Sequence, residues 1–292
     1  MSFVIFVGGL LEYNSGKTTI AKDIIDFFEK DLSLQTTPLK PLSGNNLYYH
    51  HDLIKEHVGN YGNLVSLDIV DLILNSSSEI SQTIANPVHR VSTQALAYDF
   101  FNEGSISTFY SKYSGSETLL QRFTSCHNND AKDFFLVNEP IYKNPKFWND
   151  VSLTEPILEK AKEIKLFKND HEYHSLNSQY YAEATKSSFD YIKENSSIVV
   201  IEGFNNSAHP AWCIRESDVI FLVGPGSLFL YEPEVYFRAI DNYRSINRNK
   251  PTTTEEVLKL ATPKEAHSLP SDKKKRKETL QDLLQKIHGK QK

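Results

Sequence analysis

Hydrophobic and polar positions near the start of the chain follow the order strand, loop, helix, strand. Residues 3–7 (FVIFV) form an unbroken run of β-branched and aromatic residues, which predicts a buried strand. Residues 18–30 then place isoleucine and phenylalanine at largely helical spacing, and residues 35–40 form a short strand candidate that ends before Pro41. This order is the unit of a parallel α/β sheet.

The last third of the chain predicts two more strands and two helices. Residues 198–201 (IVVI) and 218–223 (DVIFLV) have the composition of buried strands, and residues 232–244 show a helical pattern. Residues 273–288 predict a basic helix with leucine and isoleucine on one face. We therefore predict an α/β fold with a mostly parallel central sheet flanked by helices and a basic C-terminal helix.

The middle of the chain does not continue this alternation. Between about residues 102 and 150 the composition shifts towards serine, asparagine, tyrosine and phenylalanine, and prolines interrupt the stretch. We interpret it as a helical or irregular insertion that caps the carboxyl ends of the strands, because its aromatic residues must be buried against something. Helices are predicted in the whole middle region over residues 64–74, 86–101, 116–125, 154–166 and 177–194.

The predicted organisation is a single domain over residues 1–272, followed by a basic helix or tail over residues 273–292. The chain has 292 residues, of which 39 % are hydrophobic and 24 % charged, and this excludes wholesale disorder and a collagen-like fibre. No apolar run reaches the ~18 residues of a membrane-spanning helix, and the apolar start lacks the basic segment of a signal peptide. Two cysteines without metal-ligand spacing exclude a disulfide scaffold and favour the cytoplasm.

The net charge of −5 argues against nucleic-acid binding by the molecule as a whole. The imbalance is local, because five basic residues stand in succession near the end of the chain. This run is compatible with binding of a nucleic acid or an acidic partner, although a solvated helix is the more ordinary interpretation. The five residues are Lys273, Lys274, Lys275, Arg276 and Lys277.

The strongest chemical signal is the segment GGLLEYNSGKTT at residues 8–19, between the first strand and the first helix. A phosphate-binding loop needs converging N–H groups, glycine where the backbone approaches the phosphates, a lysine, and a hydroxyl for Mg²⁺. Gly16, Lys17 and Thr18 supply the second half of this pattern in the expected order. Leu11 stands where the standard pattern has its first glycine, so the loop starts from the earlier glycine pair and is longer than the standard one.

Three further segments follow predicted strands, at the edge where ligands of α/β sheets bind. In SIVVIEGFNNSAHP, Glu202 follows a buried strand and is suited to reach Mg²⁺ directly or through water. In LKPLSGNN, Lys40 is suited to balance phosphate charge or to hold an acidic substrate. In DVIFLVGPG, the closing turn is suited to contact a base through main-chain groups. Solvated side chains and a plain turn remain the alternative interpretation of these segments.

Taken in order, these segments resemble the SIMIBI branch of P-loop NTPases, and more narrowly the dethiobiotin synthetase and cobyrinic acid synthase group. That group has an extended phosphate loop, a KP-x-x-x-G segment after the second strand and an EG step after a later strand. The IEGFNNSAHP stretch also resembles a stretch of the molybdopterin-guanine dinucleotide adapter proteins. The resemblance covers about residues 1–60 and 195–245.

The resemblance implies that ATP and Mg²⁺ are the cofactors and that Lys17, Lys40 and Glu202 are the catalytic residues. Lys17 would contact the β- and γ-phosphates, Thr18 and Glu202 would serve Mg²⁺, and Lys40 would lie near the transferred phosphate or the substrate. The implied nucleotide-binding residues are Gly9, Asn14, Ser15, Gly16, Lys17, Thr18 and Thr19 in the loop, and Gly224, Pro225 and Gly226 near the base.

The same resemblance implies a third carboxylate for Mg²⁺ or water between residues 45 and 75. Asp52 is the first candidate, because it follows Lys40 by one loop. Asp68 and Asp71 lie in an apolar-periodic run and are expected on a helix surface.

Three functions are compatible with these features. The first is an ATP-dependent phosphoryl-transfer or ligase-like enzyme that acts on a small substrate. The alternative is a nucleotide-dependent switch or adapter ATPase that acts on a protein partner, favoured by the IEGF stretch and the basic tail. A nucleic-acid-processing ATPase or kinase rests only on the tail and the aromatic insertion. ATP is preferred over GTP because no NKxD-type guanine motif occurs, and the sequence leaves a homodimer open and predicts no membrane association.

Overall fold

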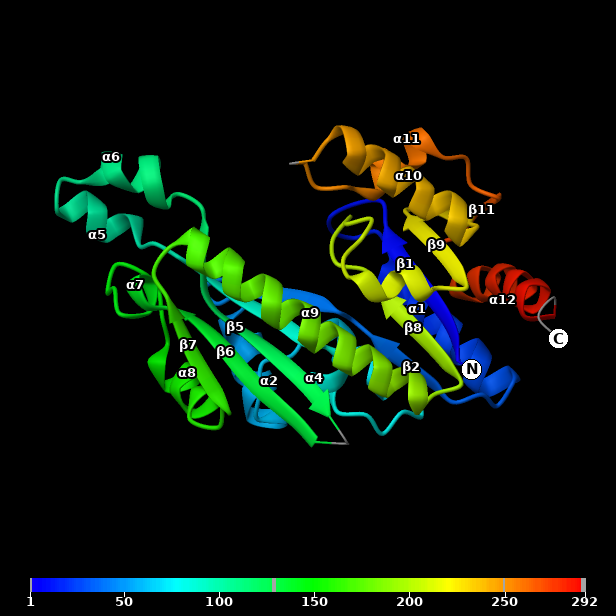
Figure 1. Cartoon of the computed structure of the whole chain (residues 1–292), viewed down its shortest axis with the longest axis horizontal. Coiled ribbons are helices and arrows are strands. Elements are labelled where there is room, and N and C mark those ends of the chain that lie inside the picture. Colours follow the sequence, from blue (N-terminus) through cyan, green and yellow to red (C-terminus); the bar gives the residue numbers. More distant parts are fainter. Residues whose placement is uncertain (1, 128–129, 249, 290–292) are drawn as a thin grey trace. The chain divides into compact units, whose positions relative to one another are not determined.

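The computed structural model describes residues 2–127, 130–248 and 250–289. The chain forms an α/β protein with two mixed sheets and divides into two compact units, which we call unit 1 and unit 2 (Figure 1). The chain passes between the units after residues 41, 66, 81 and 188. Unit 1 consists of Met1–Pro41, Leu67–Ser81 and Phe189–Lys292, and unit 2 of Leu42–Ser66 and Gln82–Ser188.

Unit 1 is built on a six-stranded sheet. Its strands are β1 (Phe3–Gly9), β2 (Thr36–Leu39), β8 (Ile198–Glu202), β9 (Val219–Gly224), β10 (Ser227–Tyr231) and β11 (Glu265–Ser268). Their order across the sheet is β11-β10-β9-β1-β8-β2. The pairs β2–β8, β8–β1 and β1–β9 are parallel, whereas β10 and β11 are added antiparallel. The carboxyl ends of β1, β2, β8 and β9 therefore meet at one edge of the sheet.

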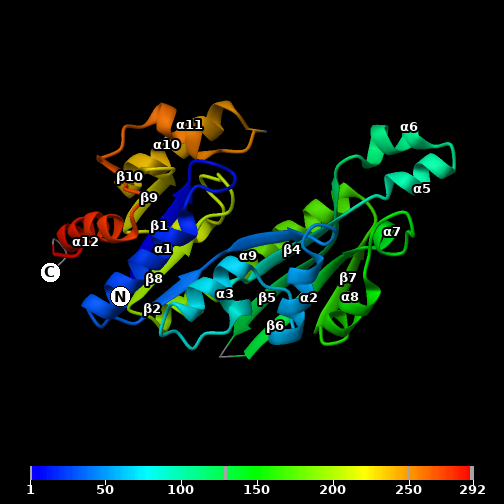
Figure 2. The same cartoon turned by 180° about the vertical axis from the view of Figure 1, so that it is seen from behind.

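The strands predicted over residues 3–7, 198–201 and 218–223 are confirmed as β1, β8 and β9, and every residue of these strands is buried. Helix α1 packs on β8, β1 and β2 with α3 and α12 beside it, whereas α10 packs on β9 (Figure 2). Burial of both faces explains why these strands are continuous apolar runs. The helices of unit 1 are α1 (Lys17–Asp26) with the π-helical turn η1 (Phe27–Asp31), α3 (Leu67–Leu74), the 3₁₀ turn η3 (Trp212–Glu216), α10 (Pro233–Ile246), α11 (Thr254–Leu260) and α12 (Lys273–Gly289).

Helix α12 confirms the predicted C-terminal helix, and it is docked on α1. Its leucine face is buried, and two of its basic residues pair with carboxylates of α1. Arg276 donates to Asp23 at 2.9 Å, and Lys277 pairs with Asp26. Part of the basic run therefore fastens the helix to unit 1.

Unit 2 has a sheet of its own, with five strands in the order β3-β4-β5-β6-β7. These are β3 (Leu42–Asn46), β4 (Val88–Gln94), β5 (Ser116–His127), β6 (Asp130–Asn138) and β7 (Glu163–Phe167). The pairs β3–β4 and β6–β7 are parallel, and the two central pairs are antiparallel. The helices are α2 (His51–Tyr61), α4 (Gln82–Ala85), α5 (Ala97–Asn102), α6 (Ile106–Thr108) with the π-helical turn η2 (Phe109–Tyr113), α7 (Glu139–Tyr142), α8 (Val151–Leu158) and α9 (Asp170–Glu194), whose last turns belong to unit 1.

The prediction of a helical or irregular insertion is wrong. The stretch predicted as a helix over residues 116–125 is the long strand β5, and residues 86–101 contain β4 before α5 begins. Residues 154–166 are divided between the end of α8 and β7. β5 is buried over eight consecutive residues that include Arg122 and Thr124, so it lacks the alternation that marks a half-buried strand.

The aromatic-rich stretch from 102 to 150 is thus part of a larger unit with its own core. One apolar cluster gathers around Phe100, Leu120 and Phe147, and a second around Phe123 and Phe167. This division differs from the predicted single domain with a short insertion, and a cap over the strand ends stays a prediction.

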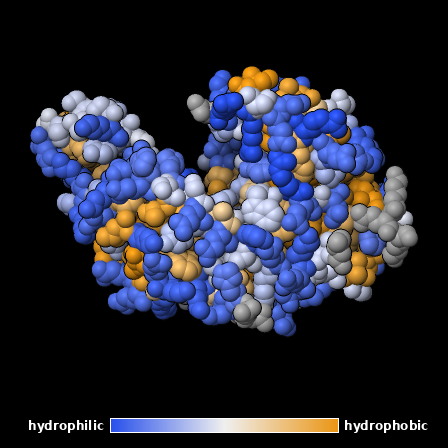
Figure 3. Space-filling view, viewed as in Figure 1, coloured by the Kyte–Doolittle hydropathy of each residue, from blue (hydrophilic) through white to orange (hydrophobic). Residues whose placement is uncertain are grey.

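Exposed large hydrophobic side chains are scattered over both units, and hydrophilic residues cover most of the face drawn in Figure 3. Within the ranges that the structure describes, none of the helices combines the length and apolarity needed to cross a bilayer.

Candidate functional site

The edge where β1, β8 and β2 end brings together residues that the sequence analysis selected. β1 ends at Gly9 and β8 ends at Glu202, which is aligned with Val7 of β1. Lys40 directly follows β2, which lies on the other side of β8. All of these residues belong to unit 1. The parallel topology alone therefore places the lysine and the carboxylate at one sheet edge.

The loop between β1 and α1 is shaped by two left-handed residues and one serine. Asn14 has φ 57° and Gly16 has φ 89°, a backbone region that glycine and asparagine enter most readily. Ser15 Oγ accepts the N–H of Leu11 at 2.9 Å and donates to its carbonyl at 2.7 Å. The loop is therefore closed on itself before α1 begins, and the first N–H groups of α1 lack partners within the helix.

Lys17 lies at the start of α1 and folds back against the backbone of Gly9. A Cβ at position 9 would lie 2.7 Å from Lys17 Nζ, so glycine is required for this approach. Burial lowers the pKa of Lys17, with the nearby charge of Lys40 adding to the effect and Glu202 opposing it. Within the described part of the chain, no hydrogen bond or ion pair of Lys17 is found. An ammonium beside a helix N-terminus adds positive charge at a place that already favours anions.

Glu202 is the centre of a buried polar cluster. Its Oε1 accepts a hydrogen bond from Thr18 Oγ1 at 3.1 Å and one from Lys40 Nζ at 2.8 Å. Lys40 Nζ also lies 2.5 Å from Asp68 Oδ2. Burial opposes the charge on Lys40, but the carboxylates of Glu202 and Asp68 raise its pKa, so it stays protonated.

The second carboxylate oxygen of Glu202 is the strongest indication of a ligand at this site. Glu202 Oε2 is buried and has no hydrogen-bond partner among the described residues. A buried carboxylate oxygen without a partner is costly unless a cation or donor completes it. Mg²⁺ is usually held by one or two carboxylates together with substrate phosphates, and the Glu202 carboxylate and Thr18 hydroxyl fit that set. No group of three or more His, Cys, Asp or Glu that could hold a metal is found in the described ranges.

Asp68 lies on the surface of a helix, as expected, and the structure also brings its carboxylate to Lys40. Asp68 lies in the first turn of α3 in unit 1, and its carboxylate contacts Lys40. Asp71 is at the exposed position expected for it and pairs with Lys22 at 2.6 Å. Asp52 belongs to α2 of unit 2, where it is exposed and lies 3.2 Å from His51. The signal in the sequence that could have indicated this contact is a carboxylate in the first turn of a helix whose other residues, apart from Asp71, are apolar.

A cavity of about 310 Å³ lies beside the N-terminus of α1, also within unit 1. It has the size of a small-molecule site. It joins the loop between β1 and α1 to the turn after β9 and to the chain that leads into α12. Its lining includes Asn14, Ser15, Gly16 and Thr19, the predicted turn Gly224, Pro225 and Gly226, and Leu269, Pro270 and Arg276.

The FNNSAHP segment after Glu202 runs past the loop and into the protein. Asn205 donates to Glu12 at 3.2 Å, which joins this segment to the loop between β1 and α1. Further on, burial, together with the charges of Arg244 and Arg215, lowers the pKa of His209 to about 4. His209 is therefore neutral at pH 7.

Comparisons with protein-family models, with curated proteins and with solved structures found no match for this chain. Unit 1 contains most of the residues that the sequence singled out: the loop between β1 and α1, Lys40, Glu202 and the turn at 224–226. Asp52 lies in unit 2.

Proposed function

We propose that unit 1 binds Mg²⁺-ATP and that the chain is a P-loop NTPase that transfers or activates a phosphoryl group on a small substrate. The observation that carries this proposal is the buried cluster of Lys17, Thr18, Lys40 and Glu202 at one sheet edge, with Glu202 Oε2 left unpartnered. A purely structural ion pair would not require the left-handed loop or the glycine beneath Lys17.

The phosphate groups would be bound by the start of α1. The N–H groups of its first turn and the ammonium of Lys17 supply fixed positive charge where the backbone of Gly9 leaves room for it. Fixed charge of this kind stabilises the negative charge that grows on the phosphoryl oxygens during transfer.

The metal would be held by Thr18 Oγ1 and the Glu202 carboxylate. Held there, Mg²⁺ would supply positive charge that offsets the charge of the phosphate groups. Lys40, kept protonated by Glu202 and Asp68, would present a second positive charge to the transferred group or to an acidic substrate. The 310 Å³ cavity beside Gly224, Pro225 and Gly226 would accept the base.

Isothermal titration calorimetry with ATP, ADP and GTP in the presence of Mg²⁺ tests this proposal. Lys17→Ala should weaken ATP binding by about 1.5–3 kcal/mol, the range for a hydrogen bond to a charged group. Lys22→Ala is the matched control, because Lys22 lies on the same helix but pairs with Asp71 at the surface. The proposal fails if the wild-type protein binds no nucleotide at millimolar concentration, or if folded Lys17→Ala binds ATP as well as the control does.

A further inference from the structure

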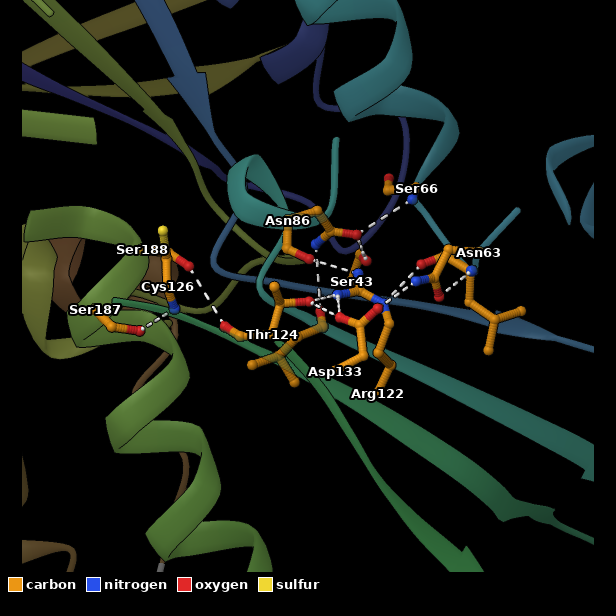
Figure 4. A network of polar contacts seen from close by, with 12 residues as sticks. Ser43, Asn63, Ser66, Asn86, Arg122, Thr124, Cys126, Asp133, Ser187 and Ser188 are labelled. Atoms are coloured by element: carbon orange, nitrogen blue, oxygen red, sulfur yellow. Dashed lines mark hydrogen bonds and ion pairs between the residues drawn. The ribbon is translucent and has the colours of Figure 1, made fainter. Parts of the chain in front are cut away.

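Unit 2 contains a network of buried polar groups around Asn86 and Arg122 (Figure 4). Both side chains are fully buried. Burial lowers the pKa of Arg122, and the negative charge of Asp133 partly offsets this effect. The Arg122 guanidinium donates to the carbonyl of Asn86 at 2.6 Å and to that of Leu64 at 2.9 Å. It also contacts Thr124. A buried network this well satisfied fixes the segments it joins.

The side-chain oxygen of Asn86 joins two segments that are far apart in sequence. Asn86 Oδ1 accepts a hydrogen bond from Ser43 Oγ at 2.8 Å and one from the backbone N–H of Ser66 at 3.2 Å. The amide nitrogen of Asn86 donates to the carbonyl of Val88 at 3.2 Å, which fixes the orientation of the side chain. All of these residues belong to unit 2.

The two segments lead directly to the ion pair of the candidate site. Ser43 follows Lys40 by three residues, and Ser66 precedes Asp68 by two, so each serine lies just inside unit 2 where the chain crosses. Such short stretches span at most about 11 Å, and Pro41 restricts one of them. Lys40 Nζ and Asp68 Oδ2 are themselves 2.5 Å apart. The chain from Lys40 to Ser43, the hydrogen bonds of Asn86 and the chain from Ser66 to Asp68 therefore form a closed ring.

We propose that Asn86 is a positioning residue for the candidate site. Its side-chain oxygen sets the spacing of Ser43 and Ser66, and this spacing holds Lys40 and Asp68 in the arrangement that places Lys40 against Glu202. Unit 2 thereby acts on the site through two short chain segments. The inference rests on the proposed function only where turnover is the readout.

Three variants test the ring. Asn86→Ala removes the shared acceptor, whereas Asn86→Asp keeps an acceptor oxygen for both partners and loses the donor to the Val88 carbonyl. Thr93→Val is the matched control: Thr93 is fully buried in β4 of the same unit, and its hydroxyl donates to the carbonyl of Trp148. Asn86→Ala should lower kcat for ATP turnover by about tenfold or more and leave ATP affinity nearly unchanged, because the phosphate loop is untouched.

Asn86→Asp should restore most of kcat, and Thr93→Val should leave it unchanged. The loss from Asn86→Ala should also be largely absent when it is added to Asp68→Asn, because the ring is then already broken. Equal kcat for Asn86→Ala and Thr93→Val, or independent multiplication of the losses from Asn86→Ala and Asp68→Asn, would overturn the proposal.

A second readout does not depend on nucleotide chemistry. Reductive methylation followed by mass spectrometry measures the reactivity of each lysine, and Lys40 should be protected because its side chain is 7 % exposed. In Asn86→Ala the labelling of Lys40 should increase severalfold while that of Lys17 stays constant, and in Thr93→Val neither should change. If Lys40 is labelled equally in both variants, Asn86 does not position it. If Lys40 responds as expected but the wild-type protein binds no nucleotide, the ring stands and the proposed function fails.

Discussion

Replacing Lys40 by methionine would remove the ammonium that lies against the buried carboxylate of Glu202. Lys40 Nζ is 2.8 Å from Glu202 Oε1, and the two side chains are 7 % and 1 % exposed. Methionine preserves most of the length and apolar volume of lysine, so the substitution chiefly removes the charge. The variant leaves the Glu202 carboxylate inside unit 1 without this partner.

The expected loss of stability follows from this geometry. With an effective dielectric constant of about 20, two unit charges 2.8 Å apart attract each other by roughly 6 kcal/mol. Part of this is offset because methionine needs no desolvation, and removal of one partner from a buried pair costs about 3–5 kcal/mol. Asp68 is 44 % exposed and can be solvated, so it changes this value little. We expect Lys40→Met to lower the free energy of unfolding of unit 1 by about 3–5 kcal/mol.

Replacing Glu202 by glutamine in addition should compensate for the stability lost in Lys40→Met. The double variant K40M/E202Q has no uncompensated charge at this buried position, and it should recover most of the lost stability. Lys22→Met is the matched control, since Lys22 lies 2.6 Å from Asp71 but both side chains are substantially exposed. Its cost should stay below about 1 kcal/mol.

Urea unfolding followed by tryptophan fluorescence measures these differences within unit 1. The chain has two tryptophans, and Trp148→Phe leaves Trp212, which belongs to unit 1 and packs on Phe189. The reasoning is refuted if Lys40→Met costs no more than Lys22→Met. It is equally refuted if K40M/E202Q is less stable than Lys40→Met alone.

Two further predictions concern the loop between β1 and α1 and the half-buried His209. Gly9→Ala should weaken Mg²⁺-ATP binding about tenfold or more in calorimetry, because the new Cβ would lie 2.7 Å from Lys17 Nζ and displace the ammonium. Gly59→Ala is the control and should leave the affinity unchanged, because a Cβ at position 59 has no atom within 4 Å. Equal ATP affinities of the two variants would contradict the role of Gly9. The pKa of His209 is about 4, below its unfolded value near 6.5, so its contribution to stability is complete above pH 6.5 and is lost as the pH falls to 4. In urea unfolding of unit 1, the wild-type protein should therefore lose up to ~3 kcal/mol more of its free energy of unfolding between pH 6.5 and 4 than the His209→Gln variant does. If the free energies of unfolding of the two proteins depend on pH in the same way, His209 does not contribute in this manner.

The central strands of unit 1 could be predicted because they are short apolar runs, whereas its antiparallel strands β10 and β11 were not predicted. β1, β8 and β9 are buried at every residue, so each one is a continuous apolar run in the sequence. The segments with chemical character follow these strands directly, and a parallel sheet brings them to one edge. The positions of Lys17, Thr18, Lys40 and Glu202 thus follow from local sequence and topology together.

Unit 2 could not be predicted in the same way, because β5 has buried polar residues. Arg122 and Thr124 are fully buried, and Arg122 donates to the carbonyls of Leu64 and Asn86, which are distant in sequence. A pattern of hydrophobic positions cannot show that a charged residue is inside the protein. The contact of Asp68 with Lys40 was not predicted for a related reason, since only the folded chain brings the two side chains together.

The position of β8 between β1 and β2 has a consequence for the synthesis of the chain on the ribosome. β1 and β2 are made first, but the strand that pairs with both begins only at Ile198. All residues of unit 2 have been synthesised by then, since they end at Ser188. The nascent chain must therefore carry β1 and β2 without their shared neighbour while unit 2 is free to fold, and unpaired strand edges are prone to aggregate. We expect the newly made N-terminal segment to need a chaperone until β8 emerges.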